Sequence, residues 1–372
     1  MAIFLLIVLL LCMAAILYPF LIYPALLKLL PVRTVGAQPG AHSASLLFCA
    51  YNESAAMPEK IANLAAIKAL HPDLQILAFD DGSSDDTARQ LADRSDIITL
   101  VRGNRSGKAH GMKRLAAMAT GDVLIFTDAN VVLTPESVAN LLAYYGDPGV
   151  GGVLGSLLYL QDESSATASV GQSYWKLEER LKDLESRSGN VLGADGSIFS
   201  IRRALYPEFP DTVLDDLTVS MAVIFAGKRL IKVTDVIAHE RLVAGRKDEY
   251  RRKVRIAARA WHTHRYLRPQ LRRMTLTDRF KYASRKIVRW FGAIFLAIGG
   301  LAALGLAGMV DIRLALALAL AGAIVLSLGL LSDSGPLAKV ADIVLAYMAT
   351  LQGLIRAMRG KTFAVWNPAK SR

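Results

Sequence analysis

Long apolar runs at both ends of the chain set the first limit on what it can fold into. Ile3 to Leu30 is apolar apart from Lys28, and two further runs extend over 288–310 and 312–331. A helix of about 20 apolar residues is long enough to cross a bilayer. The first run lacks a basic leader and a clear cleavage site, which favours an uncleaved anchor over a signal peptide. The sequence therefore predicts a transmembrane anchor at 1–32.

The region between these runs predicts one α/β domain, at 43–270. Short apolar segments alternate there with helical patterns, as is typical of a Rossmann-like, mostly parallel, doubly wound sheet. The expected strands are 45–50, 74–79, 97–101 and 123–126, and the expected helices between them are 57–70, 87–93 and 109–119. Polar clusters follow the first, second and fourth strands, at the edge where such sheets bind ligands.

The positive charge of the chain is concentrated beside the expected spans. The net charge is +12, and Arg246 to Arg289 is rich in arginine and lysine. Basic residues beside spans mark the cytoplasmic side and are attracted to anionic headgroups, so we expect a membrane partner and no nucleic acid. Cys12 and Cys49 make no disulfide framework, which fits a reducing compartment. These features predict a multi-pass protein of the cell (inner, cytoplasmic) membrane with its catalytic domain in the cytoplasm.

The C-terminal third divides further by composition. Residues 271–287 resemble an interfacial amphipathic segment, because basic and apolar side chains are interleaved there. Residues 288–356 are expected to form transmembrane or re-entrant helices, followed by a basic cytoplasmic tail at 357–372. Upstream, Trp175, Glu178, Lys182 and Glu185 lie at helical spacing, and packing together with surface pairs between neighbouring turns accounts for them.

The stretch Thr120 to Asn130, TGDVLIFTDAN, contains the clearest candidate site. Its apolar run predicts a strand buried on both faces, and the run ends at Asp128. A carboxylate does not lie unpaired in an apolar core, so Asp128 is expected at the end of the strand. The oxygens of Asp128 and Asn130 suit a divalent cation that is also held by phosphate. The alternative is an Asx turn that closes the strand.

Several motifs, in this order and spacing, resemble the nucleotide-sugar half of glycosyltransferase family 2, which has the GT-A fold. They are FCAYNES, FDDGSSDDT, RGNRSGKAHG and FTDAN, followed by YWKLEERLKDLES, LGADGSIFSIRR, LDDLTVS and KVRIAARAW. The likeness extends from about Ser45 to Tyr266. The flanking apolar runs are similar to those of membrane-bound polysaccharide and glycolipid synthases of this family.

The resemblance implies roles for the residues on the donor side. Tyr51, Glu53 and Asp81 would contact the uridine of a UDP-sugar, since uracil and ribose donors need acceptors. Lys108 matches the Gly-Lys of the family and would contact the pyrophosphate. Asp128 and Asn130 match its Asp-x-Asp, with the second acid replaced, and would hold Mg²⁺ or Mn²⁺.

The resemblance also implies catalytic residues. The acids Asp215 and Asp216 match the family's acid pair, of which the second is the general base that deprotonates the acceptor hydroxyl. A single base opposite the leaving group implies direct displacement with inversion, from an α-linked donor to a β-linked product. Arg255 matches the arginine of Gln-x-x-Arg-Trp, but Arg252 and Ile256 replace the other two residues. The missing aromatic platform predicts a short product rather than a long polymer.

These features together predict an inverting, metal-dependent, membrane-bound hexosyltransferase that acts on a UDP-sugar in exopolysaccharide or cell-envelope synthesis. Its acceptor would be a membrane-associated lipid or oligosaccharide, and subunits of polysaccharide synthesis are potential partners. One alternative is a single-addition glycolipid synthase that acts on ceramide, diacylglycerol or polyprenyl phosphate. The other is a scaffold subunit with a decayed transferase domain, for which Asn130 and Ile256 are the motivating departures.

Overall fold

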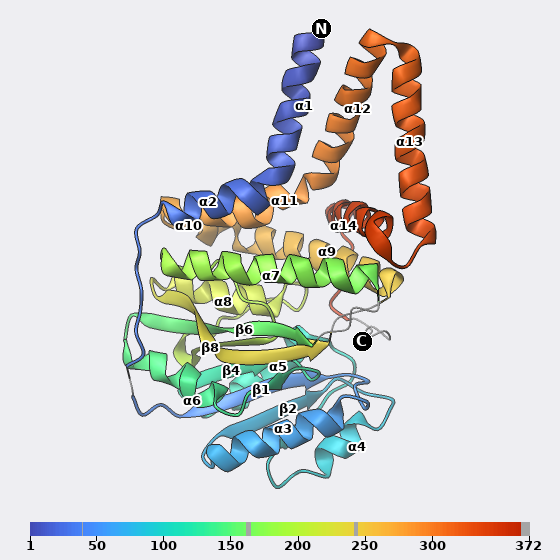
Figure 1. Ribbon diagram of the computed structural model, residues 1–372. Coiled ribbons are helices and arrows are strands. Elements are labelled where there is room, and N and C mark those ends of the chain that lie inside the picture. Colours follow the sequence, from blue (N-terminus) through green and yellow to red (C-terminus); the bar gives the residue numbers. More distant parts are fainter. Residues whose placement is uncertain (39, 161–164, 242–244, 366–372) are drawn as a thin grey trace.

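The computed structural model describes residues 1–38, 40–160, 165–241 and 245–365. Figure 1 shows an α/β unit, a layer of helices that lie across its upper side, and three helices that rise from that layer. The chain enters by one of the rising helices and returns to the other two after the α/β unit is complete.

The first half of the sheet is parallel, as the alternating pattern predicts. β2, β1 and β4 pair side by side in parallel, and β3 pairs with the outer edge of β2. The four strands are β1 (Ala44–Ala50), β2 (Gln75–Asp80), β3 (Thr99–Arg102) and β4 (Val123–Thr127). Their carboxyl ends therefore lie at one edge of the sheet, where polar residues follow β1, β2 and β4.

The second half of the sheet is mixed. β7 is antiparallel to both β4 and β6, while β8 is parallel to β6 and antiparallel to the short β5. These strands are β5 (Val132–Leu133), β6 (Val150–Leu160), β7 (Ile198–Arg202) and β8 (Arg229–Arg241). The order across the eight strands is β3-β2-β1-β4-β7-β6-β8-β5, which confirms a mostly parallel α/β sheet.

Helices cover both faces of this sheet, and the apolar strands supply both cores. In β4, Leu124 and Phe126 pack in one buried cluster, whereas Val123 and Ile125 pack in the other. Successive side chains point to opposite faces, so a strand buried on both faces reads as an unbroken apolar run. The helices are α3 (Met57–Leu70), α4 (Thr87–Ala92), α5 (Lys108–Met118), α6 (Ser137–Leu142) and α8 (Asp215–Phe225), with 3-10 turns at Ala143–Gly146 and Arg203–Leu205.

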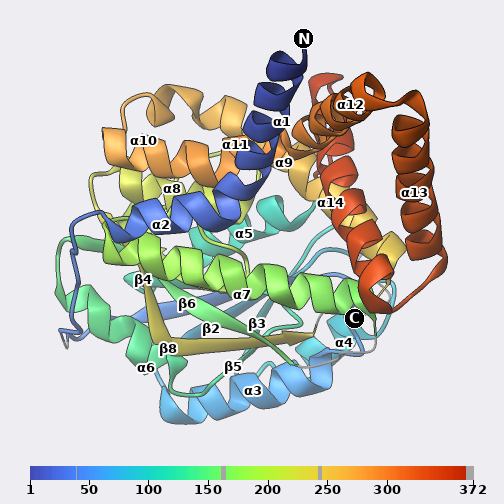
Figure 2. The ribbon, with the colours of Figure 1, turned by 45° about the horizontal axis from the view of Figure 1, so that its top comes forward.

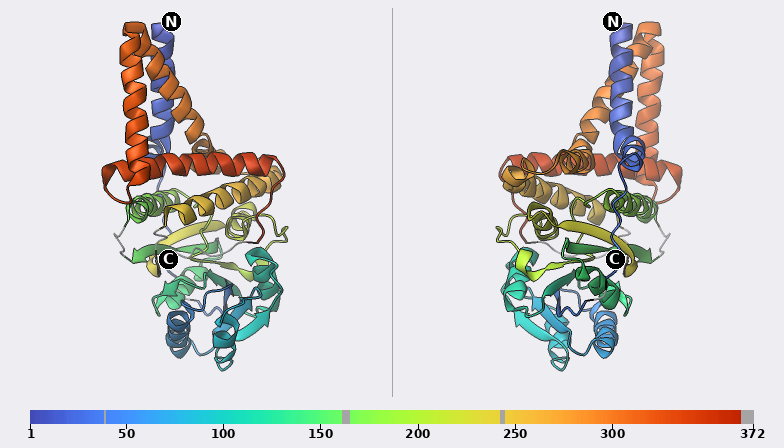
Figure 3. Two further views of the ribbon diagram at one scale, coloured as in Figure 1. Left: turned by 90° about the vertical axis from the view of Figure 1, so that its right-hand side faces the viewer. Right: turned by 90° about the vertical axis from the view of Figure 1, so that its left-hand side faces the viewer.

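Four helices in the described part of the chain are long and apolar enough to cross a membrane. The first is α1 (Ala2–Leu17), which continues through the π-helical turn η1 (Tyr18–Ile22) into α2 (Tyr23–Lys28). The others are α12 (Gly292–Val310), α13 (Ile312–Leu331) and α14 (Gly335–Met358). Figure 3 shows α14 lying across the feet of the other three rather than beside them.

The position of α14 explains how it tolerates a buried acid. Asp342 accepts a hydrogen bond from Thr167 at 2.9 Å and pairs with Arg246. Arg246 in turn donates to the carbonyl oxygens of Leu330 and Ser332, at the end of α13. An unpaired carboxylate inside a bilayer is costly. The negative charge of Asp342 is instead balanced by the positive charge of Arg246.

The layer under the rising helices is formed by α7 (Ala166–Arg187), α9 (Arg246–Leu271), α10 (Leu276–Tyr282), the π-helical turn η4 (Ala283–Ile287) and α11 (Val288–Trp290). Figure 2 shows α2 lying along α7, with α10 and α11 beside it. Residues 271–287, expected as an interfacial segment, lie within this layer.

Buried ion pairs tie this layer together, and here the expectation of surface pairs on α7 is wrong. Arg285 of η4 donates to Glu185 at 2.7 Å and to Glu178 at 3.1 Å. Glu185 also accepts from the hydroxyl of Tyr23 at 2.6 Å, and it is fully buried. Helical spacing alone does not distinguish a solvated face from one covered by α2 and η4, so the sequence pattern missed this network.

We expect Glu185→Ala to destabilise the folded chain by about 3–5 kcal/mol, because Arg285 would lose a buried partner. The measurement is the thermal unfolding midpoint of the purified chain in detergent. Asp93→Ala is the matched control, since Asp93 pairs with Arg89 on the surface and such pairs contribute about 0–1 kcal/mol. Equal shifts for the two variants would contradict a structural role of the buried network.

Candidate active site

The candidate site lies at the carboxyl edge of β1, β2 and β4, in front of the N-terminus of α5. The loop between β3 and α5 is shaped by Asp81, which follows β2 and is fully buried. Its carboxylate accepts from the backbone N–H of Ser106 at 2.6 Å and of Gly107 at 3.0 Å, and from the Arg105 guanidinium at 3.0 Å. Asp81 thus fixes the loop that leads into the helix.

Arg105 of this loop faces the residues that follow β1. The Arg105 guanidinium stacks on the ring of Tyr51, 3.3 Å from its centroid. Gly107 has a positive φ of +94°, and a β-carbon there would lie 2.3 Å from the carbonyl oxygen of Ala364. The same segment is anchored at Lys361, three residues before Ala364, because the carbonyl oxygen of Lys361 lies 2.9 Å from the His262 ring. The segment after α14 therefore passes over the loop that precedes α5.

Lys108, the first residue of α5, lies between the two acidic motifs. Its ammonium group is 2.5 Å from the carboxylate of Asp128 and 3.8 Å from that of Asp215. Burial alone lowers the pKa of Lys108, but the carboxylates of Asp128, Asp215 and Asp216 outweigh it and raise the pKa above its usual value. The lysine is therefore a permanent cation that joins β4, α5 and α8 in one site.

Asp216 has the properties of a general base at neutral pH. Burial, followed by the charge of Asp215, raises its pKa from 3.8 to about 6. One of its oxygens accepts from the backbone N–H of Leu217 at 2.7 Å, which orients the carboxylate. A base with a pKa just below the working pH is largely deprotonated and still able to accept a proton.

Arg259 is a site residue that the sequence patterns missed. It lies on α9, is almost fully buried, and its guanidinium is 3.8 Å from Asp215 while it also donates to the carbonyl oxygen of Val213. Arg255, which the family motif singled out, lies one turn earlier on the same helix, and exposed Ile256 follows it. The available signal was the spacing of four residues between the two arginines, which places both on one side of α9.

A second missed residue is Glu240, near the end of β8. The side-chain amide of Asn130 donates to its carboxylate at 3.0 Å. The acid that the Asp-x-Asp pattern lacks at position 130 is thus present beside that position, on a strand distant in sequence. No local motif indicates such a carboxylate, because the pairing of β5 with β8, which sets Val132 opposite His239, brings Glu240 beside Asn130.

The residues around Asp128 fit a divalent cation. Asp128, Asn130 and Glu240 offer oxygen ligands, which Mg²⁺ and Mn²⁺ prefer. Gly196 lies close to this group, since a β-carbon there would lie 3.1 Å from an Asp128 oxygen and 2.7 Å from the Lys108 nitrogen, so a larger side chain would crowd both. The Lys108 ammonium already lies as a cation against Asp128. The chemistry of these donors therefore suits a metal ion that takes the place of the Lys108 ammonium against Asp128.

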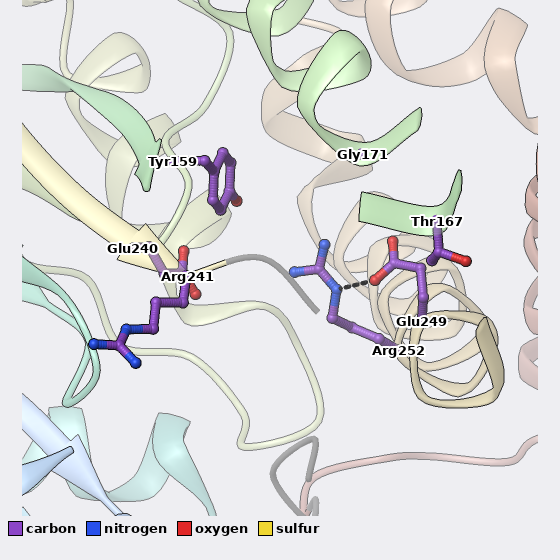
Figure 4. A pocket seen from close by; sticks show the side chains of 7 residues that line it. All are labelled: Tyr159, Thr167, Gly171, Glu240, Arg241, Glu249 and Arg252. Carbon is purple, nitrogen blue, oxygen red and sulfur yellow. Dashed lines mark hydrogen bonds and ion pairs between the residues drawn. The ribbon is translucent and has the colours of Figure 1, made fainter. Parts of the chain in front are cut away.

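A narrow cavity next to Glu240 extends the site toward α9. Figure 4 shows Arg252, held by Glu249, reaching from α9 toward Tyr159 and the end of β8. Burial alone lowers the pKa of Arg252, but the charge of Glu249 outweighs burial, so the pKa lies above its usual value. This side of the site presents hydroxyl, carboxylate and guanidinium groups around a cavity of about 10 Å³.

Comparison with known proteins identifies similar sequences. Residues 45–209 match the profile of the family described as Glycosyl transferase family 2. Curated relatives include the undecaprenyl-phosphate 4-deoxy-4-formamido-L-arabinose transferases of Enterobacter sp. (strain 638) and of Klebsiella pneumoniae subsp. pneumoniae, each 32% identical over 108 and 111 residues. The matches cover 27% and 28% of this chain, and they span only 33% and 34% of the length of these relatives.

One solved structure is similar over almost the whole chain. It is a mannosyltransferase from Pyrobaculum calidifontis in complex with GDP-Man and Mn²⁺, with a TM-score of 0.72. The match covers 96% of this chain and 99% of that chain at 21% sequence identity. At this identity the likeness establishes the fold, which is GT-A with flanking apolar helices, and not the substrates.

Proposed function

We propose that this chain, in which residues 45–209 form a glycosyl transferase family 2 domain of the GT-A fold, moves a sugar from a UDP-sugar to a hydroxyl group of a membrane-associated acceptor. The observation that carries this proposal is the cluster in which the Lys108 ammonium lies against Asp128 and 3.8 Å from buried Asp215, with Asp216 next to Asp215 at the start of α8. Such a site holds a cationic group for the leaving diphosphate and a base for the acceptor.

The donor half of the site is assigned to the loop before α5. Backbone N–H groups at a helix N-terminus favour phosphate, and Lys108 places an ammonium group at this N-terminus. In the donor complex Lys108 exchanges its contact with Asp128 for the pyrophosphate. Tyr51, Glu53 and Asp81 are assigned to the nucleoside side, where Asp81 acts chiefly by holding the loop.

Asp128 and Asn130, with Glu240, are assigned to the divalent cation. A cation bound there would neutralise the negative charge that develops on the UDP leaving group. Lys108, which lies against Asp128, would contribute a second positive charge. The chain's own contribution is to hold these charges in place before the donor binds, so that little reorganisation is needed during transfer.

The acceptor half of the site is assigned to Asp216. Its carboxylate takes the proton of the acceptor hydroxyl, whose oxygen bonds to the anomeric carbon as the bond to UDP breaks. Asp215 and Arg259 are positioning residues, because Arg259 balances the charge of the acid pair and anchors the turn at Val213. Attack opposite the leaving group converts an α-linked donor to a β-linked product. Arg255 is proposed on the acceptor side of this half.

A second candidate acceptor is a polyprenyl phosphate. It is favoured by the curated relatives, whose names state transfer to undecaprenyl phosphate. A phosphate oxygen is already anionic near neutral pH, so such an acceptor needs no general base. A hydroxyl acceptor is favoured by Asp216, which lies at the start of α8 with its carboxylate oriented by the Leu217 N–H and its pKa raised by burial and by Asp215.

Release of nucleoside diphosphate from a panel of donors tests the proposal. The purified full chain in detergent is given Mn²⁺, UDP-sugars or GDP-mannose, and either a glycolipid hydroxyl acceptor or undecaprenyl phosphate. We expect UDP release that depends on the hydroxyl acceptor. Release only from GDP-mannose would overturn the donor, and dependence on undecaprenyl phosphate would select the second candidate. No acceptor-dependent release from any donor would favour a scaffold role.

A further inference from the structure

A cavity outside the active site opens between the end of α9, α10 and η4. Its volume is about 480 Å³, which is within the range of small-molecule sites. Most of its lining is apolar or aromatic, and the rest is basic. The lining residues are His264, Arg268, Leu271, Arg272, Met274, Leu276, Arg279, Phe280, Tyr282, Ala283 and Ile287.

The charge of this cavity has one sign. Three arginines line it, at 268, 272 and 279, and no acid does. In the described part of the chain these arginines form no ion pair. Burial, followed by the charge of Arg268, lowers the pKa of His264, so the ring is neutral at pH 7 and contributes no further charge. The cavity therefore presents three guanidinium groups without a counter-ion from the protein.

The cavity also lies beside the feet of the apolar helices. Figure 1 shows α10 beside α2 and α11, at the foot of α1 and α12. Leu276, at the start of α10, is 80% exposed, and η4 leads through α11 directly into the apolar α12. Apolar and basic side chains together at this depth match the two parts of a phospholipid, the acyl chain and the phosphate.

We propose that this cavity binds the headgroup of an anionic phospholipid, with its phosphate on Arg268, Arg272 and Arg279. The part of the acyl chain nearest the headgroup would pack against Leu276, Phe280 and Ile287. Guanidinium groups bind phosphate oxygens by paired, charge-assisted hydrogen bonds. The lipid would hold α10 and the end of α9 against the bilayer.

The bound lipid is distinct from the acceptor. Arg268 lies nine residues along α9 from Arg259, which contacts Asp215, so the axial separation is about 13 Å at about 1.5 Å per residue. A phosphate held by Arg268 therefore lies too far from the acid pair to react there. The proposal does not depend on the assignment of donor or acceptor.

Binding of short-chain phospholipids to the full chain in nonionic detergent tests the proposal. The probes are dioctanoyl-phosphatidylglycerol and dioctanoyl-phosphatidylcholine, and the readout is the retained adduct by native mass spectrometry. Arg268→Gln/Arg272→Gln removes charge from the cavity. Arg265→Gln/Arg273→Gln removes the same charge from exposed positions that do not line it. Ala283→Phe fills the cavity without changing its charge.

We expect phosphatidylglycerol to bind the wild type and the Arg265/Arg273 control alike. The Arg268/Arg272 variant and Ala283→Phe should each bind it at least about tenfold more weakly, because each removes one part of the site. Equal weakening in the two double variants would show a diffuse surface charge instead of a site and would overturn the proposal. Equal binding of phosphatidylcholine by the wild type would overturn the role of the anionic headgroup. If Ala283→Phe does not fold, the comparison of the two double variants still decides.

Discussion

Asp216→Asn is expected to lower the rate of transfer by about 10²–10⁴-fold, the range that a general base contributes. Affinity for UDP should stay within a few-fold of the wild type, because the base acts only in the transition state. The measurements are initial rates of UDP release and calorimetric titration with UDP. Asp211→Asn is the matched control, since Asp211 pairs with Lys113 and lies outside the acid pair. A near wild-type rate for Asp216→Asn would contradict the assignment and favour a phosphate acceptor.

The pH dependence of the wild type tests the same residue. The base must be deprotonated, so activity should be full above the raised pKa of about 6 and fall as pH drops through it. Below that point kcat/KM should decline about tenfold per pH unit. A decline that begins only near pH 4, the ordinary range of an aspartate, would show that the working base is not Asp216 in its buried environment.

The second large effect is expected at the metal ligands. Glu240→Gln should weaken Mn²⁺ binding by about 10–100-fold, because the carboxylate that accepts from Asn130 would be lost. Free Mn²⁺ measured by electron paramagnetic resonance, in the presence of UDP, reports binding without turnover. Glu59→Gln is the control, since this exposed acid near Arg241 has the same charge and lies outside the donor set.

Moving the acid back to position 130 should restore binding. Asn130→Asp alone should tighten Mn²⁺ binding, and Asn130→Asp/Glu240→Gln should recover affinity to within a few-fold of the wild type. Recovery follows if the site needs two carboxylates and is indifferent to which strand supplies the second. A double variant as weak as Glu240→Gln would show that Glu240 acts elsewhere, and turnover that resists EDTA would remove the metal from the mechanism.

Local patterns were sufficient to predict the parallel half of the sheet. The expected strand 123–126 is observed as Val123–Thr127, and the expected helix 57–70 is observed as Met57–Leu70. In these elements the spacing of apolar residues reflects burial directly, because the strand is buried on both faces and the helix covers one face of the sheet. The mixed half of the sheet could not be predicted from such local patterns. β7 lies between β4 and β6, and its place depends on long-range pairing that no periodicity reports.

The candidate site divides in the same way. Asp81, Lys108, Asp128 and Asp215 lie in motifs, and the structure brings them into one site. Arg259 and Glu240 enter it only through α9 and β8, which are distant in sequence from those motifs. The sequence also misassigned Glu185, because a charged residue at helical spacing is usually solvated and here is covered by α2 and η4. Burial of charge by distant elements is therefore what the sequence patterns could not predict.

The length of the product tests the central claim most directly. The purified chain is incubated with excess UDP-sugar, Mn²⁺ and a lipid acceptor, and the products are weighed by mass spectrometry. Ile256 lies at the position where processive glycosyltransferases of this type carry an aromatic platform. The described helices α1, α12 and α13 are too few to enclose a channel for a polymer. The account predicts one or a few sugars on the lipid, with one UDP released for each. High-molecular-mass polymer from this chain alone, or UDP release without a glycosylated product, would contradict it.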